Sequence, residues 1–178
     1  MNNNVLIVVD MQIDFIDGAL GSSEAVAILP HVVDKVRSFE GKIIFTFDTH
    51  DDDYLQSQEG RLLPVPHCIK GHNGWRLPEV LEKLCVEVDG LRFEKPTFGS
   101  VKLAQYLVDM HQQTPIDSIE IVGLCTDICV VSNALLIKAH LPEVPICVDA
   151  SCCAGVTPAK HTAALETMRS CQIAVKDA

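Results

Sequence analysis

"SIEIVGLCTDICVVSNALLIKAH", residues 118–140, contains the transition on which the fold depends. Residues 118–124 form a short apolar run, which is typical of a buried strand in a parallel sheet. Residues 127–140 follow with the apolar spacing of a helix. A buried strand that leads directly into a helix predicts an α/β fold, in which parallel strands alternate with the helices that cover them.

The rest of the chain repeats this alternation. Further strands are expected at 5–10, 41–48, 91–94, 144–149 and 172–175, and further helices at 24–38, 78–85, 100–111 and 158–169. We therefore expect one domain, residues 1–178, with three α/β/α layers around a mostly parallel sheet of about six strands. Residues 49–75 show neither pattern, and so long an irregular stretch predicts a functional loop.

Composition excludes several classes of protein. The 178 residues carry a net charge of −10, which argues against nucleic acid or an anionic membrane as a partner. No apolar run approaches the roughly 20 residues of a membrane helix, and the opening MNNNVLIVVD lacks the basic region of a signal peptide. The eight cysteines lie mostly in apolar runs. We therefore expect a cytoplasmic protein with reduced cysteines that act mainly as small hydrophobic residues.

Reactive side chains follow four of the predicted strands. In an open parallel sheet, ligands bind beyond the carboxyl ends of the strands, which all lie at one edge. The residues at these strand ends are Asp10, Asp48 with His50, Lys95, and Cys125 with Cys129. The sequence therefore predicts a site at this edge of the sheet.

Cys129 is a candidate nucleophile because it falls in the first turn of the predicted helix 127–140. Unpaired N–H groups at a helix N-terminus lower the pKa of a thiol and can also bind an oxyanion. Lys95 would stabilise the thiolate, and Asp10 would carry the proton. Each residue also has an ordinary interpretation: a buried cysteine, a surface lysine, and an aspartate that caps a turn.

A second group of candidate residues surrounds the loop 49–75. Asp48 and His50 are two residues apart, so both side chains point the same way on an extended chain, and His67 follows after a proline-rich bend. One carboxylate and two imidazoles suit Zn²⁺, Fe²⁺ or Mn²⁺. The alternative is a solvated acidic loop with incidental histidines.

Several blocks of sequence, taken together in their order and spacing, match a known family. They are VVDMQIDFIDGAL, FDTH, PVPHC followed by KGHNGW, FEKPTFGS, GLCTDICV and VDASCCAG. The chain resembles the isochorismatase-like cysteine hydrolases over almost its whole length, and among them it is most similar to the nicotinamidases. The resemblance implies a Rossmann-like three-layer fold.

The resemblance also implies roles for individual residues. The family's catalytic triad falls on Asp10, Lys95 and Cys129, and the backbone N–H groups of Cys125 and Cys129 would form the oxyanion hole. The peptide between Leu124 and Cys125 would be cis. The family's metal ligands fall on Asp48, His50 and His67, with Glu59 as a further candidate ligand. Candidates to line an aromatic substrate slot are Phe15, Trp75 and Phe98, and His72 is expected near its rim.

The implied activity is hydrolysis of nicotinamide to nicotinate and ammonia through a thioester on Cys129. One divalent metal ion per chain would assist, with Zn²⁺ favoured over Fe²⁺ or Mn²⁺, and copies of the chain would form a homo-oligomer. A related enzyme acting on another small carboxamide, an N-carbamoyl compound or a ureide is the nearest alternative. A binding module without catalysis on the same fold is a further one, and the intact set of Asp10, Lys95 and Cys129 argues against it.

Overall fold

A computed structural model describes residues 3–176, which build one six-stranded sheet. All neighbouring strands pair in parallel, in the order β3-β2-β1-β4-β5-β6. The strands are β1 (Asn4–Val9), β2 (Lys42–Asp48), β3 (Leu91–Lys95), β4 (Ser118–Leu124), β5 (Ile146–Ala154) and β6 (Ala174–Lys176). The predicted parallel α/β architecture is thereby confirmed.

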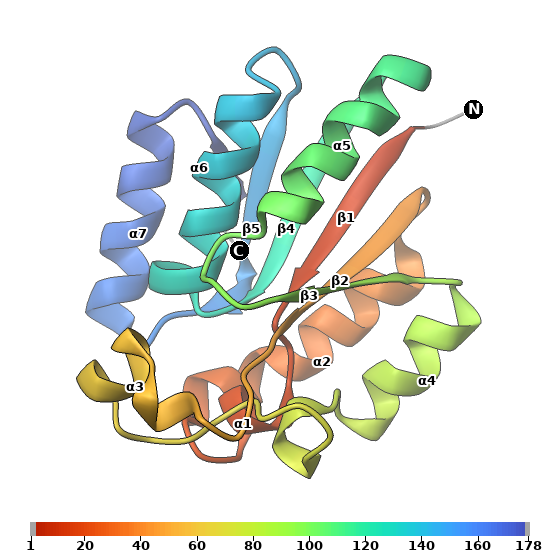
Figure 1. Ribbon diagram of the computed structural model, residues 1–178. Coiled ribbons are helices and arrows are strands. Elements are labelled where there is room, and N and C mark those ends of the chain that lie inside the picture. Colours follow the sequence, from red (N-terminus) through yellow and green to blue (C-terminus); the bar gives the residue numbers. More distant parts are fainter. Residues whose placement is uncertain (1–2, 177–178) are drawn as a thin grey trace.

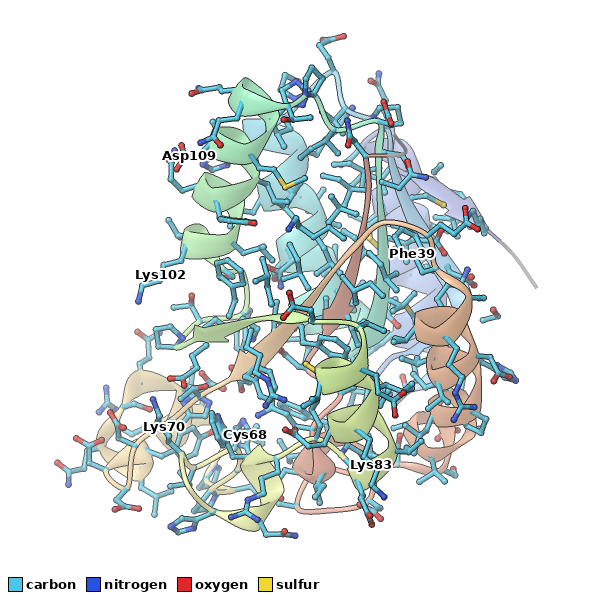
Figure 2. All side chains as sticks on the ribbon, turned by 90° about the vertical axis from the view of Figure 1, so that its right-hand side faces the viewer. Phe39, Cys68, Lys70, Lys83, Lys102 and Asp109 are labelled. Atoms are coloured by element: carbon cyan, nitrogen blue, oxygen red, sulfur yellow. The ribbon has the colours of Figure 1, made fainter. Side chains whose placement is uncertain are left out.

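Helices cover both faces of this sheet (Figure 1). One face packs against α1 (Ile13–Ile16), α2 (Ser23–Ser38) and α4 (Glu79–Glu87), and the other against α5 (Val101–Gln113), α6 (Val131–His140) and α7 (Pro158–Ser170). Figure 2 shows α5, with Lys102 and Asp109, on one side of the strands and the end of α2 near Phe39 on the other. These are the three predicted layers.

Strand β1 shows why two layers of helices are needed. Its residues alternate between two apolar cores: Leu6 and Val8 belong to one, and Val5, Ile7 and Val9 to the other. All five side chains are fully buried. A strand whose two faces are both apolar is stable only when helices cover both, which is the arrangement of a central parallel strand.

The order of the strands places a crevice at one end of β1. From β1 the chain continues outward to β2 and β3, and it then returns to the other side of β1 for β4, β5 and β6. The carboxyl ends of β1 and β4 therefore flank the point at which the winding direction reverses. In open α/β sheets this reversal is the usual ligand site.

The segment 49–75 is more structured than the sequence suggested. It contains two short 3₁₀ helices, η1 (Tyr54–Gln56) and η2 (Asn73–Trp75), and the short helix α3 (Gln58–Leu62). Ser57 explains where α3 begins, because its side chain accepts a hydrogen bond from the Gly60 N–H. Helices of three to five residues leave too little periodic pattern to be recognised in a sequence.

Two further elements differ from expectation. The predicted helix 127–140 consists of a π-helical turn, η3 (Thr126–Val130), followed by α6. The predicted strand 144–149 is observed as β5, which begins two residues later. It also ends later, because Cys153 and Ala154 pair with Gly123 and Leu124 after an irregularity in the register. The eight cysteines are all free. No helix within residues 3–176 has the length and apolar character needed to cross a membrane.

Candidate active site

Asp10, Lys95 and Cys129 meet at the carboxyl edge of the sheet, and all three are buried. Lys95 Nζ lies 2.6 Å from Oδ2 of Asp10 and donates to Sγ of Cys129 at 3.3 Å. It also donates to Oδ1 of Asp48 at 3.1 Å. The three protons of one ammonium group therefore point toward a carboxylate, a thiol and a second carboxylate.

The Asp10 carboxylate is fixed from a neighbouring strand. Thr46 on β2 donates its hydroxyl to Asp10 Oδ1 at 2.6 Å. The Asp10 N–H in turn donates to the Thr46 carbonyl at 3.2 Å. Asp10 adopts a φ of +46°, a left-handed conformation that aspartate tolerates better than most residues. This turn directs the carboxylate toward Lys95 directly after β1 ends.

Burial sets the protonation of these three groups. It raises the pKa of Asp10, and Lys95 only partly offsets the effect. Burial alone would lower the pKa of Lys95, but Asp10, Cys129 and Asp48 hold it above its ordinary value. A buried ammonium therefore faces a carboxylate whose proton affinity is increased, which suits Asp10 to act as a general base.

The prediction that the Cys129 thiol has a low pKa is wrong. Burial raises the pKa of this thiol well above its ordinary value, the charge of Asp10 raises it further, and Lys95 opposes both. The thiol is only 4% exposed and lies in a π-helical turn. Loss of hydration therefore outweighs the stabilisation that Lys95 gives to a thiolate.

The turn that carries Cys129 begins with two unusual backbone features. Gly123, at φ +117°, lies so close to β1 that an added Cβ would meet the Val9 carbonyl oxygen at 2.1 Å. The next peptide, between Leu124 and Cys125, is cis, as the resemblance implied. Only glycine therefore fits this position, which lies three residues before the turn that carries Cys129.

Asp48, His50, Glu59 and His67 form a cluster beside the triad. One donor atom from each lies within 4.8 Å of every other. His50 Nε2 is 3.1 Å and His67 Nε2 3.5 Å from Asp48 Oδ2, and each of these nitrogens is 3.8 Å from Glu59 Oε1. Two imidazole nitrogens and two carboxylate oxygens suit Zn²⁺, Fe²⁺ or Mn²⁺.

The surroundings of the cluster also fit a cation. The Nδ1–H of His67 donates to the Val65 carbonyl at 2.8 Å, which leaves Nε2 facing the cluster, as in most metal-binding histidines. Burial would raise the pKa of Asp48, but His50, His67 and Lys95 bring it below its ordinary value. The residues present therefore fit a divalent metal ion.

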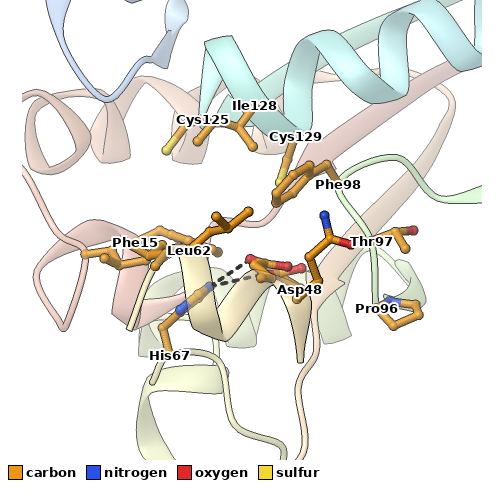
Figure 3. Close-up of a pocket in the computed structure, with 14 residues that line it drawn as sticks. Phe15, Asp48, Leu62, His67, Pro96, Thr97, Phe98, Cys125, Ile128 and Cys129 are labelled. Carbon is orange, nitrogen blue, oxygen red and sulfur yellow. Dashed lines mark ion pairs between the residues drawn. The ribbon is translucent and has the colours of Figure 1, made fainter. Parts of the chain in front are cut away.

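One cavity is lined both by Cys129 of the triad and by Asp48, Glu59 and His67 of the cluster (Figure 3). Its lining consists of Phe15, Leu20, Asp48, Gln58, Glu59, Leu62, Leu63, His67, Pro96, Thr97, Phe98, Cys125, Ile128 and Cys129. Two of the three candidate aromatic residues, Phe15 and Phe98, are among them. Cys129 and the metal cluster thus face the same space.

The structure does not bring Trp75 or His72 to this cavity. The Trp75 indole N–H donates to Thr49 Oγ1 at 2.9 Å, and its ring packs against Phe47 with centroids 5.6 Å apart. Trp75 therefore supports the end of β2 from behind. His72 lines a separate hollow, where its Nε2 lies 3.7 Å from Asp52 Oδ1.

Two buried side-chain amides that position the site were not predicted from the sequence. The Gln12 side chain donates to the Asp48 carbonyl at 2.9 Å and accepts from the Asp48 N–H at 2.8 Å, so it fixes the end of β2. The Asn133 side chain donates to the Cys129 carbonyl at 2.8 Å and to the Phe98 carbonyl at 3.1 Å. In the sequence, each of these amides is only a polar residue among apolar neighbours. That pattern does not show which backbone groups the amide binds.

Known proteins resemble the chain in both sequence and fold. The family model "Isochorismatase domain" matches residues 4–178. Among curated proteins, no significant match was found.

Solved structures resemble the chain over nearly its full length. The nicotinamidase/pyrazinamidase of Bacillus subtilis is 27% identical, with a TM-score of 0.84 and coverage of 98% of this chain and 100% of that chain. The pyrazinamidase of Pyrococcus horikoshii in complex with zinc is 27% identical, with a TM-score of 0.79 and 99% of each chain covered. The N-carbamoylsarcosine amidase of Thermoplasma acidophilum, at 22% identity and a TM-score of 0.75, covers 98% of this chain and 95% of its own and shares the fold. With the family model spanning residues 4–178, the chain belongs to the isochorismatase family.

Proposed function

We propose that the chain is a metal-containing cysteine amidohydrolase that hydrolyses nicotinamide to nicotinate and ammonia, a reaction of NAD salvage. The observation that carries the proposal is the contact of Lys95 with Asp10 and Cys129 directly behind a cavity. Cys129 lines this cavity together with Asp48, Glu59 and His67. The two nicotinamidase or pyrazinamidase structures at 27% identity support the choice of substrate.

In the first half of the reaction, Asp10 removes the proton of the Cys129 thiol as the sulfur attacks the carboxamide carbon. Lys95 stays charged and stabilises the thiolate as it forms, so a resting thiol with a high pKa is compatible with catalysis. The carbonyl oxygen becomes an oxyanion, and the N–H groups of Cys125 and Cys129 hold it. Asp10 then gives its proton to the leaving nitrogen, ammonia departs, and a thioester remains.

In the second half, the deprotonated Asp10 takes a proton from water while the water oxygen attacks the thioester carbon. The carbon–sulfur bond breaks, the proton returns to Cys129, and the carboxylic acid leaves. A divalent ion held by Asp48, His50 and His67, with Glu59 as a further ligand, would orient the ring nitrogen of the substrate. No external oxidant or reductant is required.

The same proposal extends to the organisation of the protein. Residues 1–178 would act as a single hydrolase domain, which is supported by the continuous sheet and by the family match over residues 4–178. We further propose a homo-oligomer in the cytoplasm whose partner is a small carboxamide, with neither nucleic acid nor membrane involved. The net charge of −10 supports the exclusion of nucleic acid.

Ammonia release from nicotinamide tests the proposal, with pyrazinamide, an N-carbamoyl amino acid and a ureide assayed beside it. We expect release from nicotinamide by protein loaded with Zn²⁺, and none from the Cys129→Ala variant. Release only from another amide would replace nicotinamide by that substrate and leave the cysteine mechanism in place. No release from any compound would favour a binding module without catalysis.

A further inference from the structure

We propose that the active-site cavity selects uncharged carboxamides whose acyl group continues into an apolar extension, and that it disfavours acyl groups ending in a carboxylate. The inference rests on the proposed function and names its substrate class. The extension would lie against an apolar wall, which we define as Phe15, Leu20, Leu62, Leu63, Phe98 and Ile128.

The ionisable groups of the cavity all belong to the reacting end, whereas the other polar lining residues, Gln58 and Thr97, are uncharged. Asp48, Glu59 and His67 belong to the metal cluster, and Cys125 and Cys129 to the nucleophile turn. The cavity has a volume of about 400 Å³, within the range of sites for small molecules. Away from the reacting end, the apolar wall supplies most of the remaining lining.

Three members of the wall are unusually exposed for large apolar side chains. Leu62 is 79%, Phe98 44% and Leu63 39% exposed, and all three line this one cavity. Figure 3 shows Phe98 beside Cys129 and Leu62 near Phe15. Single exposed leucines are common, but a group of them around a catalytic cavity indicates a surface that an apolar ligand covers.

Hydrogen bonds from outside the cavity hold both sides of this wall. Tyr54 donates its hydroxyl to the Leu63 carbonyl at 2.9 Å, and its ring packs against those of both His50 and His67, with centroids 4.7 and 5.0 Å away. On the opposite side, Asn133 donates to the Phe98 carbonyl at 3.1 Å. The wall is therefore supported by the same residues that surround the metal cluster and the nucleophile, so its position is set before substrate binds.

Charge excludes a carboxylate from the extension. Over residues 3–176, neither lysine nor arginine lines the cavity, and Lys95 is buried behind it in contact with Asp10 and Asp48. The carboxylates of Asp48 and Glu59 would offset the charge of a divalent ion held in the cluster. A carboxylate placed against Leu62 and Phe98 would lose part of its hydration and would meet no cation, which is unfavourable. The other polar residues of the lining, Gln58 and Thr97, are uncharged.

A series of three linear amides tests the proposal with the metal-loaded enzyme. Acetamide has no extension, hexanamide adds an uncharged chain, and adipamic acid replaces the end of that chain by a carboxylate. We expect kcat/KM for hexanamide to exceed the values for acetamide and for adipamic acid by about tenfold or more, the discrimination typical of an apolar pocket.

Two leucine variants show whether the wall causes this preference. Leu62→Ser should lower kcat/KM for hexanamide by about fivefold to tenfold while acetamide changes less than about twofold, since only the longer amide reaches the wall. Leu62 is mostly exposed, so the variant should fold. Leu55→Ser is the matched control, because Leu55 is 51% exposed in the same segment and lines a different hollow. It should leave all three values unchanged.

The outcomes separate this inference from the proposed function. Ammonia from nicotinamide, with hexanamide no better than acetamide or adipamic acid, would overturn the selectivity and leave the nicotinamidase function in place. Ammonia from hexanamide but not from nicotinamide would overturn the nicotinamidase function and leave the selectivity for an apolar extension in place. If Leu62→Ser changed the oligomeric mass in the ultracentrifuge without changing selectivity, the wall would be a contact between copies, and the inference would be overturned.

Discussion

Lys95 Nζ and Asp10 Oδ2 lie 2.6 Å apart, with no exposed surface on either side chain. Two opposite charges removed from water are stable only together, because each alone would lose its hydration without compensation. The residues come from the ends of β3 and β1, which are separated in the sheet by β2. The ion pair therefore links the proposed catalytic arrangement directly to the fold.

Replacement of Lys95 by methionine should reduce both activity and stability. The Asp10 carboxylate would stay buried without its ammonium partner, and loss of one partner from a buried pair costs about 3–5 kcal/mol. Urea denaturation of the metal-free proteins measures this loss. The double variant Asp10→Asn/Lys95→Met removes both charges and should regain most of the stability while remaining inactive. Equal stability of the single and double variants would show that the pair is not coupled.

The metal cluster should require both histidines. His50→Ala and His67→Ala should each lose most of the bound metal, measured by elemental analysis of protein purified without chelator, because each removes one of few nitrogen donors. Glu59→Gln should weaken binding less, since its carboxylate is 3.8 Å from both imidazole nitrogens. His72→Ala is the control, because this exposed histidine lies outside the cluster. Unchanged metal content in both histidine variants would remove the metal from the proposal.

The strands were predictable because their apolar runs are long and lie between polar turns. The bounds of β4 agree with the sequence prediction, and those of β1 and β2 differ by one residue. The later part of β5, which includes Ser151, was missed because small and polar residues there resemble a loop. This part becomes a strand through its pairing with Gly123 and Leu124, a long-range interaction that local patterns do not reveal.

The site was predictable to the extent that strand ends determine it. Asp10, Asp48 and Lys95 each lie at the carboxyl end of a parallel strand, so their meeting follows from topology. The direction of the Trp75 side chain does not follow in this way, because it depends on a hydrogen bond to Thr49. The pKa of Cys129 depends on its burial, and a sequence does not give the depth of a side chain.

Lys35 should contribute to stability in a pH-dependent way. Its Nζ lies 2.8 Å from Asp149 Oδ2, and Ser151 donates to the other oxygen of that carboxylate at 2.6 Å. Burial raises the pKa of Asp149, but Lys35 and Ser151 bring it below its ordinary value of 3.8. The unfolded chain therefore binds a proton more readily, so this stabilisation is present above pH 3.8 and is lost as the pH falls through the lower folded-state pKa.

Urea denaturation over a pH series checks the direction of this pH dependence. Lys35→Met should be less stable than the parent protein at neutral pH, and the difference should shrink as the pH falls below about 4. Arg37→Met is the control on the same helix, because Arg37 is exposed and lies 3.9 Å from an exposed carboxylate of Asp34. A deficit in Lys35→Met that stayed constant down to the acid limit would contradict the assignment.

Asn133 should affect turnover without touching substrate. Its amide joins the Phe98 and Cys129 carbonyls and accepts a hydrogen bond from the Ser100 N–H at 2.9 Å. Asn133→Ala would leave these buried groups without partners, at a cost of about 1–3 kcal/mol for each unsatisfied group. We expect kcat to fall about tenfold or more, the effect typical of a displaced catalytic group.

A second variant separates positioning by Asn133 from general destabilisation. Asn133→Asp keeps the acceptor for the Ser100 N–H. It replaces the amide donor by a carboxylate oxygen, which would repel the carbonyl oxygens of Phe98 and Cys129. It should therefore be less active than Asn133→Ala, as measured by kcat at a temperature where both proteins are fully folded. Wild-type kcat in either variant would show that the amide has only a packing role.

The Cys129 thiol should be essential for turnover and slow to react in the free enzyme. Cys129→Ala should abolish turnover while fold and metal content remain, and Cys125→Ala should retain most activity, because Cys125 is proposed to act through its backbone N–H.

In the free enzyme Cys129 should react with iodoacetamide more slowly at neutral pH than exposed Cys171, because burial and the charge of Asp10 raise the pKa of Cys129. Asp10→Asn removes that charge but keeps Lys95, so it should lower the pKa and speed alkylation of Cys129, followed by mass spectrometry across a pH series. An Asp10→Asn variant with unchanged alkylation would mean that the carboxylate does not control the thiol, and reversed effects of the two cysteine variants would identify Cys125 as the nucleophile.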